Sequence, residues 1–176
     1  MLIAGPETAI HWGGQEVDIA DYLIRVIADR QDKAAIADQV LRSLPDWFGI
    51  EDARVAYVQT SQDLPFWAAY VEACPVGFLS LQRHNAYTSE IFCMGIEQAF
   101  HRHGIGKALV SAAIQFSRDQ GSEFLTVKTL DASRSDEGYA RTREFYQAMG
   151  FRPLEVFPTL WGEDNPCLFM AKYLAG

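Results

Sequence analysis

Apolar residues in the first quarter of the chain recur every three or four positions, which is typical of helices. This spacing predicts one helix from about Glu16 to Asp29 and a second from about Lys33 to Leu44. Pro45 discourages continuation of the second helix. The segment DWFGIE that follows fits either a helical turn or a loop.

After this segment the pattern changes to short apolar runs separated by turn-prone residues. The runs ARVAYVQT, PFWAAYVEA, VGFLSLQRH and SEIFCMGIE are rich in Val, Phe, Tyr and Ile, as half-buried strands are. They predict a meander of strands. Alternation along the last run, in a strand without a bulge, places four residues on one face of the sheet: Glu90, Phe92, Met94 and Ile96.

Helix and strand patterns alternate in the second half of the chain. GIGKALVSAAIQFSRDQG predicts a helix that ends at Gly121, and YARTREFYQAMG predicts another that ends at Gly150. EFLTVKTL between them reads as a strand, DASRSDEG as a loop, and residues 151–157 and 166–173 as two final strands. We therefore expect one α+β domain over residues 1–176, with a mixed sheet and helices on its faces.

Composition narrows the class of protein. The chain is 49% hydrophobic and 22% charged, which is typical of a globular domain. It lacks an apolar run of the roughly 18 residues that a membrane helix needs, and its start lacks the pattern of a signal peptide. Cys74, Cys93 and Cys167 form no C-x-x-C pair, so we expect reduced thiols in the cytoplasm and no metal site. The formal net charge of −8 disfavours nucleic acid as a partner.

A glycine turn precedes the first helix of the second half, in HRHGIGKALV. A P-loop would need Gly in place of His101 and Ser or Thr in place of Ala108, and a dinucleotide fingerprint would need Gly in place of Leu109. Free amides at a helix N-terminus bind anions, and glycine lets a phosphate approach closely. The turn therefore predicts a pyrophosphate site, unless it only joins a strand to a helix.

Two motifs carry a resemblance to a known family. In the first, the glycine turn follows SEIFCMGIE; in the second, YARTREFYQAMGFRPL holds Phe145-Tyr146 and Gly150-Phe151. Together they resemble the GNAT superfamily of acetyl-CoA-dependent N-acetyltransferases over about Glu90 to Phe151. The resemblance implies a mixed, mostly antiparallel sheet flanked by helices on both faces.

The resemblance also implies where acetyl-CoA binds. Met94, Gly95 and Ile96 would pair with the pantetheine arm like an extra strand. Backbone amides would hold the pyrophosphate along the whole turn, at His101, Arg102, His103, Gly104, Ile105, Gly106, Lys107 and Ala108. His101 stands where the family carries Gln or Arg.

Acetylation of an amine needs a group that accepts the amine's proton, and the departing thiolate benefits from a proton donor. The resemblance implies that Tyr146 is the donor; the alternative is that it only packs in the core. Glu90 matches the strand glutamate that serves as base in one branch of the family, either directly or through water. Glu97, His84, His103 and a water chain are the alternatives to Glu90.

The acceptor amine is less defined by the sequence. Residues 44–50 and 157–165 would shape its pocket, because they carry aromatic and acidic side chains: Trp47, Phe48, Phe157 and Trp161 beside Asp46, Glu51, Glu163 and Asp164. We expect a small-molecule or peptide amine with a hydrophobic body, no membrane partner, and a homodimer as a possible assembly. A non-catalytic acyl-CoA-binding sensor is the alternative function.

Overall fold

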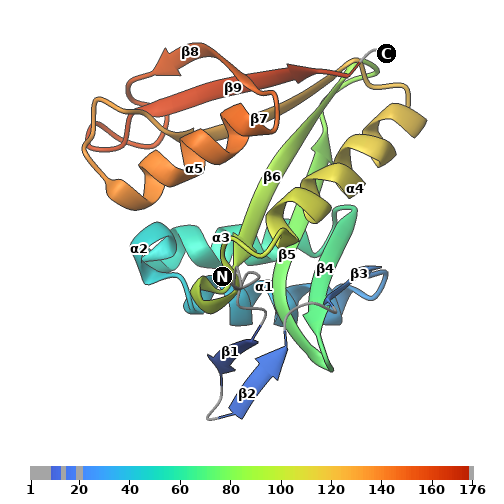
Figure 1. The fold of residues 1–176 in the computed structure, drawn as a ribbon. Helices are drawn as coiled ribbons and strands as arrows, with labels where there is room; N and C mark the ends of the chain where they lie inside the picture. The colour runs from blue at the N-terminus through green and yellow to red at the C-terminus, as the bar shows by residue number, and fades with distance from the viewer. Residues whose placement is uncertain (1–8, 13–14, 19–21, 175–176) are drawn as a thin grey trace, which may run out of the picture.

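A seven-stranded sheet organises the chain in the computed structural model, which describes residues 9–12, 15–18 and 22–174 (Figure 1). Its strands run in the order β3-β4-β5-β6-β7-β9-β8, and every neighbouring pair is antiparallel except β6 and β7. Their bounds are Tyr22–Val26 for β3, Phe66–Val71 for β4, Cys74–Arg83 for β5, Thr88–Ile96 for β6, Phe124–Leu130 for β7, Arg152–Phe157 for β8 and Cys167–Tyr173 for β9. β1 (Ala9–Trp12) and β2 (Gln15–Asp18) form a separate hairpin.

Helices cover both faces of this sheet, as the sequence predicted. One face packs against α1 (Arg30–Arg42), α2 (Pro45–Phe48) and α3 (Glu51–Ser61), through a core that includes Val40, Leu41, Phe66 and Phe78. The other face packs against α4 (Ile105–Asp119) and α5 (Glu137–Ala148). A single-turn 3₁₀ helix, η1 (Gln98–Phe100), leads from β6 into the glycine turn. The predicted helix ends at Gly121 and Gly150 are confirmed, since both glycines adopt positive φ just after α4 and α5.

The prediction of a helix from about Glu16 to Asp29 is wrong for the described part of this segment. β2 and β3 lie there, and residues 19–21 fall outside the described residues. Side chains in β3 alternate between the two faces, as in a strand: Tyr22 and Ile24 pack towards α4, whereas Leu23 between them is 55% exposed. Pairing with β4 stabilises β3 as the edge strand of the sheet.

The predicted strand ARVAYVQT is also wrong, because these residues belong to α3. Arg54 explains the difference: its side chain is almost fully buried and forms ion pairs with Asp38 of α1 and, one helical turn away, with Glu51. Glu51 and Asp52 in the first turn also favour a helix N-terminus. The undecided DWFGIE segment provides α2, with Pro45 in its first turn, and the start of α3.

A β-bulge changes which residues of β6 share a face. Cys93 pairs with Ser80 and Ile91 with Leu81, so Phe92 is the extra residue. Beyond the bulge, Met94 and Ile96 pack towards α4, whereas Phe92 and Cys93 pack towards α1 and α3. The prediction that Glu90 shares a face with Met94 and Ile96 is therefore wrong.

Candidate active site

The sheet splits between its two parallel strands. β6 and β7 pair only from Thr88 and Phe124 to Ile91 and Val127, although both strands continue beyond these pairs. Figure 1 shows them diverging towards α2. The split holds a cavity of about 690 Å³ whose walls come from β6, β7, the glycine turn, α2, α3 and α5. This side of β6 therefore offers unpaired backbone groups to a ligand, beginning after Ile91.

The glycine turn closes one end of this cavity. Gly104 adopts a φ of 86° and Arg102 a φ of 68°, and α4 begins directly afterwards without a side-chain cap from any described residue. The amides of Ile105, Gly106 and Lys107 lie in the first turn of α4, where no intrahelical carbonyl reaches them. At the two ends of the predicted segment, the amides of His101 and Ala108 donate to the carbonyls of Gln98 and Gly104.

His101, at the position where the GNAT superfamily carries Gln or Arg, stabilises the glycine turn. Its Nε2–H donates to the carbonyl oxygen of Ile96 at 2.7 Å, and its ring packs edge-on against Trp47 with centroids 5.9 Å apart. The imidazole therefore fixes the turn to the end of β6. The cavity walls include His101 with the predicted Met94, Gly95, Ile96, Arg102, Gly104, Gly106, Lys107 and Tyr146, but not His103, Ile105 or Ala108.

The packing and the charges at the glycine turn are compatible with coenzyme A. A Cβ added to Gly106 would lie 3.2 Å from Ile96 and from Phe145, so glycine lets the turn pack closely against these two side chains. Arg102 and Lys107 are exposed beside the free amides and can pair with phosphate oxygens. Thr129 on β7 also lines the cavity, and its buried Oγ1 has no hydrogen-bond partner among the described residues.

Tyr146 lies on α5 at the cavity wall and is 5% exposed. Its ring packs edge-on against Phe145 and Phe151, with centroids 5.2 and 5.4 Å away. Burial, and to a lesser extent the nearby Cys93 thiol, raises the pKa of the Tyr146 phenol above its usual range. The hydroxyl therefore keeps its proton throughout the neutral pH range and can donate it as a hydrogen bond.

This raised pKa has a measurable effect on stability. The folded protein holds the Tyr146 proton above pH 10, where the phenol of the unfolded chain loses it. The stabilisation is therefore complete below pH 10 and is lost as pH rises further, by about 1.4 kcal/mol per pH unit. We expect Tyr146→Phe to reduce this alkaline loss of unfolding free energy, measured by urea denaturation from pH 9 to pH 11. An identical slope in both proteins would contradict a buried neutral phenol.

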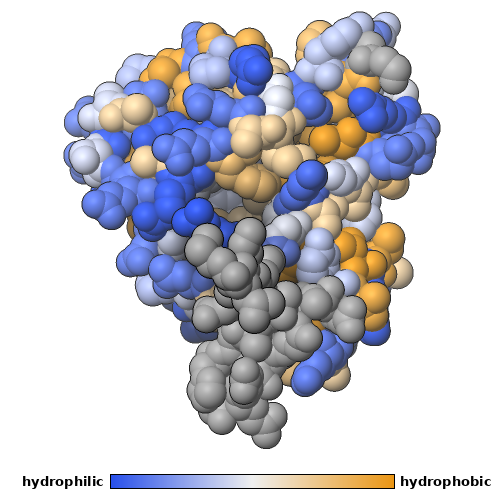
Figure 2. Space-filling view, in the orientation of Figure 1, coloured by the Kyte–Doolittle hydropathy of each residue, from blue (hydrophilic) through white to orange (hydrophobic). Residues whose placement is uncertain are grey.

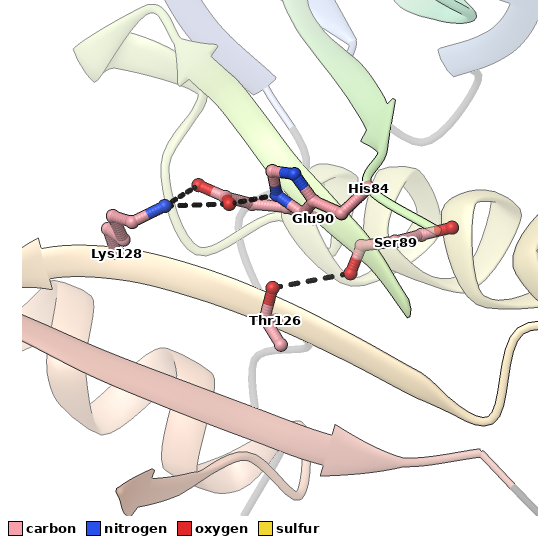
Figure 3. Close-up of polar contacts among 5 residues, drawn as sticks. All are labelled: His84, Ser89, Glu90, Thr126 and Lys128. Atoms are coloured by element: carbon pink, nitrogen blue, oxygen red, sulfur yellow. Dashed lines mark hydrogen bonds and ion pairs between the residues drawn. The ribbon is translucent and has the colours of Figure 1, made fainter. Parts of the chain in front are cut away.

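Glu90 lies outside the cavity wall but contacts a residue that belongs to it. Lys128 of β7, which lines the cavity, donates to both carboxylate oxygens at 2.7 Å, and His84 Nε2 lies 2.5 Å from one of them (Figure 3). The Glu90 side chain is 8% exposed, whereas that of His84 is 41% exposed. The three side chains form a chain of contacts from the cavity, through a buried carboxylate, to the surface. The alternation of residues along the strands could not identify Lys128 as the partner of Glu90, because Lys128 lies just beyond the last paired residues of β6 and β7.

Aromatic side chains line the rest of the cavity. Phe48, Tyr57 and Phe92 stand in a row with centroids 5.7 and 5.6 Å apart, and Trp47 and Trp161 also contribute, as the sequence predicted. Phe157 packs against Phe169 instead. The acidic residues predicted beside these aromatics do not belong to the cavity wall: Asp46 is exposed, Glu51 pairs with Arg54, and Glu163 and Asp164 line a separate hollow.

Comparison with known proteins decides the family. The sequence profile described as "Acetyltransferase (GNAT) family" matches residues 34–151, about two thirds of the chain. The chain belongs to the GNAT acetyltransferase family. No curated protein matches it at a significant level.

Solved structures of GNAT proteins share this fold. A GNAT-family structure from Desulfovibrio desulfuricans aligns with a TM-score of 0.74 and 19% identity, over 88% of this chain and 100% of its own. An aminoglycoside 6'-N-acetyltransferase complexed with coenzyme A aligns with a TM-score of 0.69 and 20% identity, over 88% and 98%. The ribosomal-protein-S18-alanine N-acetyltransferase from Escherichia coli aligns with a TM-score of 0.68 and 14% identity, over 89% of this chain and 96% of its own.

Among the described residues, no helix is both long and apolar enough to cross a membrane. No group of three or more His, Cys, Asp or Glu side chains in the described parts of the chain is arranged to hold a metal ion.

Proposed function

We propose that residues 1–176 form one N-acetyltransferase domain that transfers the acetyl group of acetyl-CoA to a primary amine. The observation that carries this proposal is the cavity between β6 and β7, with the glycine turn at one end and Tyr146 on its wall. The amides of the turn would hold the pyrophosphate, and the unpaired edge of β6 at Met94 to Ile96 would pair with pantetheine. The three free cysteines fit the reducing cytoplasm.

The reaction needs no covalent enzyme intermediate. The amine nitrogen bonds to the acetyl carbon, the carbon–sulfur bond breaks, and coenzyme A leaves as a thiol. When the amine enters as an ammonium ion, one proton is released to solvent. Tyr146 would donate a hydrogen bond to the departing sulfur, and both substrates would be bound together when the bond forms.

Glu90 remains the proposed proton acceptor, and the structure supports an indirect role. Because Lys128 stands between the carboxylate and the cavity, the amine's proton would reach Glu90 through Lys128 or an intervening water. The exposed His84 on the other side would pass it to solvent.

Glu90→Gln tests this role. We expect turnover to fall by roughly 10- to 10⁴-fold at neutral pH, because the amide cannot accept the proton. Activity should recover partly at higher pH, where more of the amine is already neutral. The pH dependence of kcat measures both effects, and Glu123→Gln is the matched control at an exposed glutamate. Unchanged turnover for Glu90→Gln, together with a loss for Glu97→Gln, would transfer the role to Glu97.

A screen of amines tests the function itself. Acetyl-CoA is incubated with the protein and a broad panel of primary amines, and the free thiol released is measured. We expect amine-dependent thiol release that far exceeds hydrolysis. Tight binding of acetyl-CoA without transfer to any amine would favour the non-catalytic acyl-CoA sensor.

A further inference from the structure

The charges on the cavity wall oppose the net charge of the chain. Asp and Glu outnumber Lys and Arg by 23 to 15, yet no acidic side chain of a described residue lines the cavity. Four basic residues do: Arg102, Lys107, Lys128 and Arg141. The cavity is therefore suited to anionic or neutral groups at both of its ends.

Coenzyme A accounts for three of these basic residues. Arg102 and Lys107 belong to the glycine turn. Arg141 lies one helical turn before Phe145, which packs over Gly106, so it belongs to the same end of the cavity. Lys128 lies apart from them, 5.8 Å from the ring of Phe169 and paired with Glu90. It is the charged residue of the cavity wall that coenzyme A phosphates do not explain.

The surroundings of Lys128 are aromatic. The row of Phe48, Tyr57 and Phe92 lies on the same side of β6 as Glu90 and Lys128, and Tyr57 is close enough to Glu90 for the carboxylate to contribute to its raised pKa. Burial is the main cause of that rise, so the phenol of Tyr57 stays neutral. Its hydroxyl makes no hydrogen bond to another described residue, so it is available to a ligand as a neutral polar group.

Hydrophilic residues on the outer surface do not change which residues line the aromatic end of the cavity. In Figure 2, hydrophilic residues gather over α2 and α5, on the outside of the cavity. Glu90, a carboxylate beside the row of Phe48, Tyr57 and Phe92, has both oxygens occupied by Lys128. A second ammonium group on an acceptor would therefore meet aromatic rings and the Lys128 ammonium without finding a free carboxylate.

We infer that the acceptor is an aromatic primary amine without a second positive charge, and that Lys128 excludes polycationic amines. A flat ring would pack against the aromatic row, as edge-to-face pairs do. The single amine would lose one proton before attack; as its nitrogen bonds to the acetyl carbon and the carbon–sulfur bond breaks, its second proton would pass to the departing sulfur, so that an uncharged amide and a thiol are formed. This inference rests on the proposed acetyl transfer, and it separates the chain from aminoglycoside acetyltransferases of the same fold.

The test compares tryptamine with spermidine, which differ in aromaticity and in the number of positive charges, and adds hexylamine to separate the two properties. For the wild-type protein we expect kcat/KM for tryptamine to exceed that for spermidine by about 100-fold or more. Hexylamine should lie between them, because it has one charge but no ring.

Lys128→Gln removes the charge and keeps a donor to Glu90. We expect it to narrow the preference for tryptamine over spermidine by about 10-fold, since one unit charge near the ligand is removed. Lys128→Arg keeps the charge and should keep the preference. Lys172→Gln, on β9 outside the cavity wall, is the matched control. If Lys128→Gln and the wild type show the same preference for tryptamine over spermidine, Lys128 does not determine which acceptor is used.

Calorimetry with the coenzyme A complex separates this inference from the proposed function. Binding of tryptamine but not spermidine, without acetyl transfer to either, would support the inferred ligand class and overturn the transferase proposal. Faster transfer to spermidine than to tryptamine would overturn the ligand class and support the transferase. Failure of all three amines to bind or react would also overturn the ligand class.

Discussion

Replacing Tyr146 by Phe is expected to lower turnover by roughly 10- to 10⁴-fold, the range for a general acid or base. The substitution keeps the ring, which packs between Phe145 and Phe151, and removes only the hydroxyl at the cavity wall. The Michaelis constant for acetyl-CoA should change much less, because the proposed pyrophosphate site consists of backbone amides of the glycine turn, which this substitution leaves in place. Steady-state kinetics with the best acceptor from the amine panel measures both constants.

Tyr173→Phe is the control for this experiment, because Tyr173 is 60% exposed at the end of β9. It should leave both constants unchanged. Wild-type turnover in folded Tyr146→Phe would show that Tyr146 only packs in the core, the alternative that its sequence motif left open.

Gly106→Glu is expected to weaken coenzyme A binding by roughly 100-fold or more, since each hydrogen bond to a charged group contributes about 1.5–3 kcal/mol. The new side chain would clash with Ile96 and Phe145, and its negative charge would lie next to the proposed pyrophosphate site. Isothermal titration calorimetry with coenzyme A measures the loss, and circular dichroism shows whether the fold survives.

Ser111→Glu places the same charge on the exposed side of α4, farther along the helix. It should bind coenzyme A as the wild type does. Undiminished affinity in a folded Gly106→Glu protein would move the pyrophosphate away from the glycine turn.

Local signals predicted the parts of this fold that local chemistry determines. The glycine turn before α4 and the helix ends at Gly121 and Gly150 all depend on residues close together in sequence. The glycine turn forms the end of the cavity where we propose that coenzyme A binds, so that end was the most predictable part of the proposed site.

The errors arose where distant residues decide the structure. The valines of ARVAYVQT favour a strand, yet burial of Arg54 against Asp38 of α1 makes the segment a helix. The spacing of Glu51 and Arg54 was the available signal, since residues three apart meet on a helix. The bulge at Phe92 turned Glu90 to the other face of the sheet, and alternation by itself carries no trace of an inserted residue. The absence of acidic side chains from the described cavity wall also depends on the assembled fold.

The central claim is that acetyl passes directly from coenzyme A to an amine in the cavity between β6 and β7. A single-turnover experiment tests it most directly, with the protein in excess over acetyl-CoA labelled in its acetyl group and with tryptamine as acceptor. We expect labelled N-acetyltryptamine to appear at the same rate as free thiol, no label to stay on the protein, and Tyr146→Phe to slow both signals equally. Thiol release without labelled amide, or label retained on the protein, would contradict it.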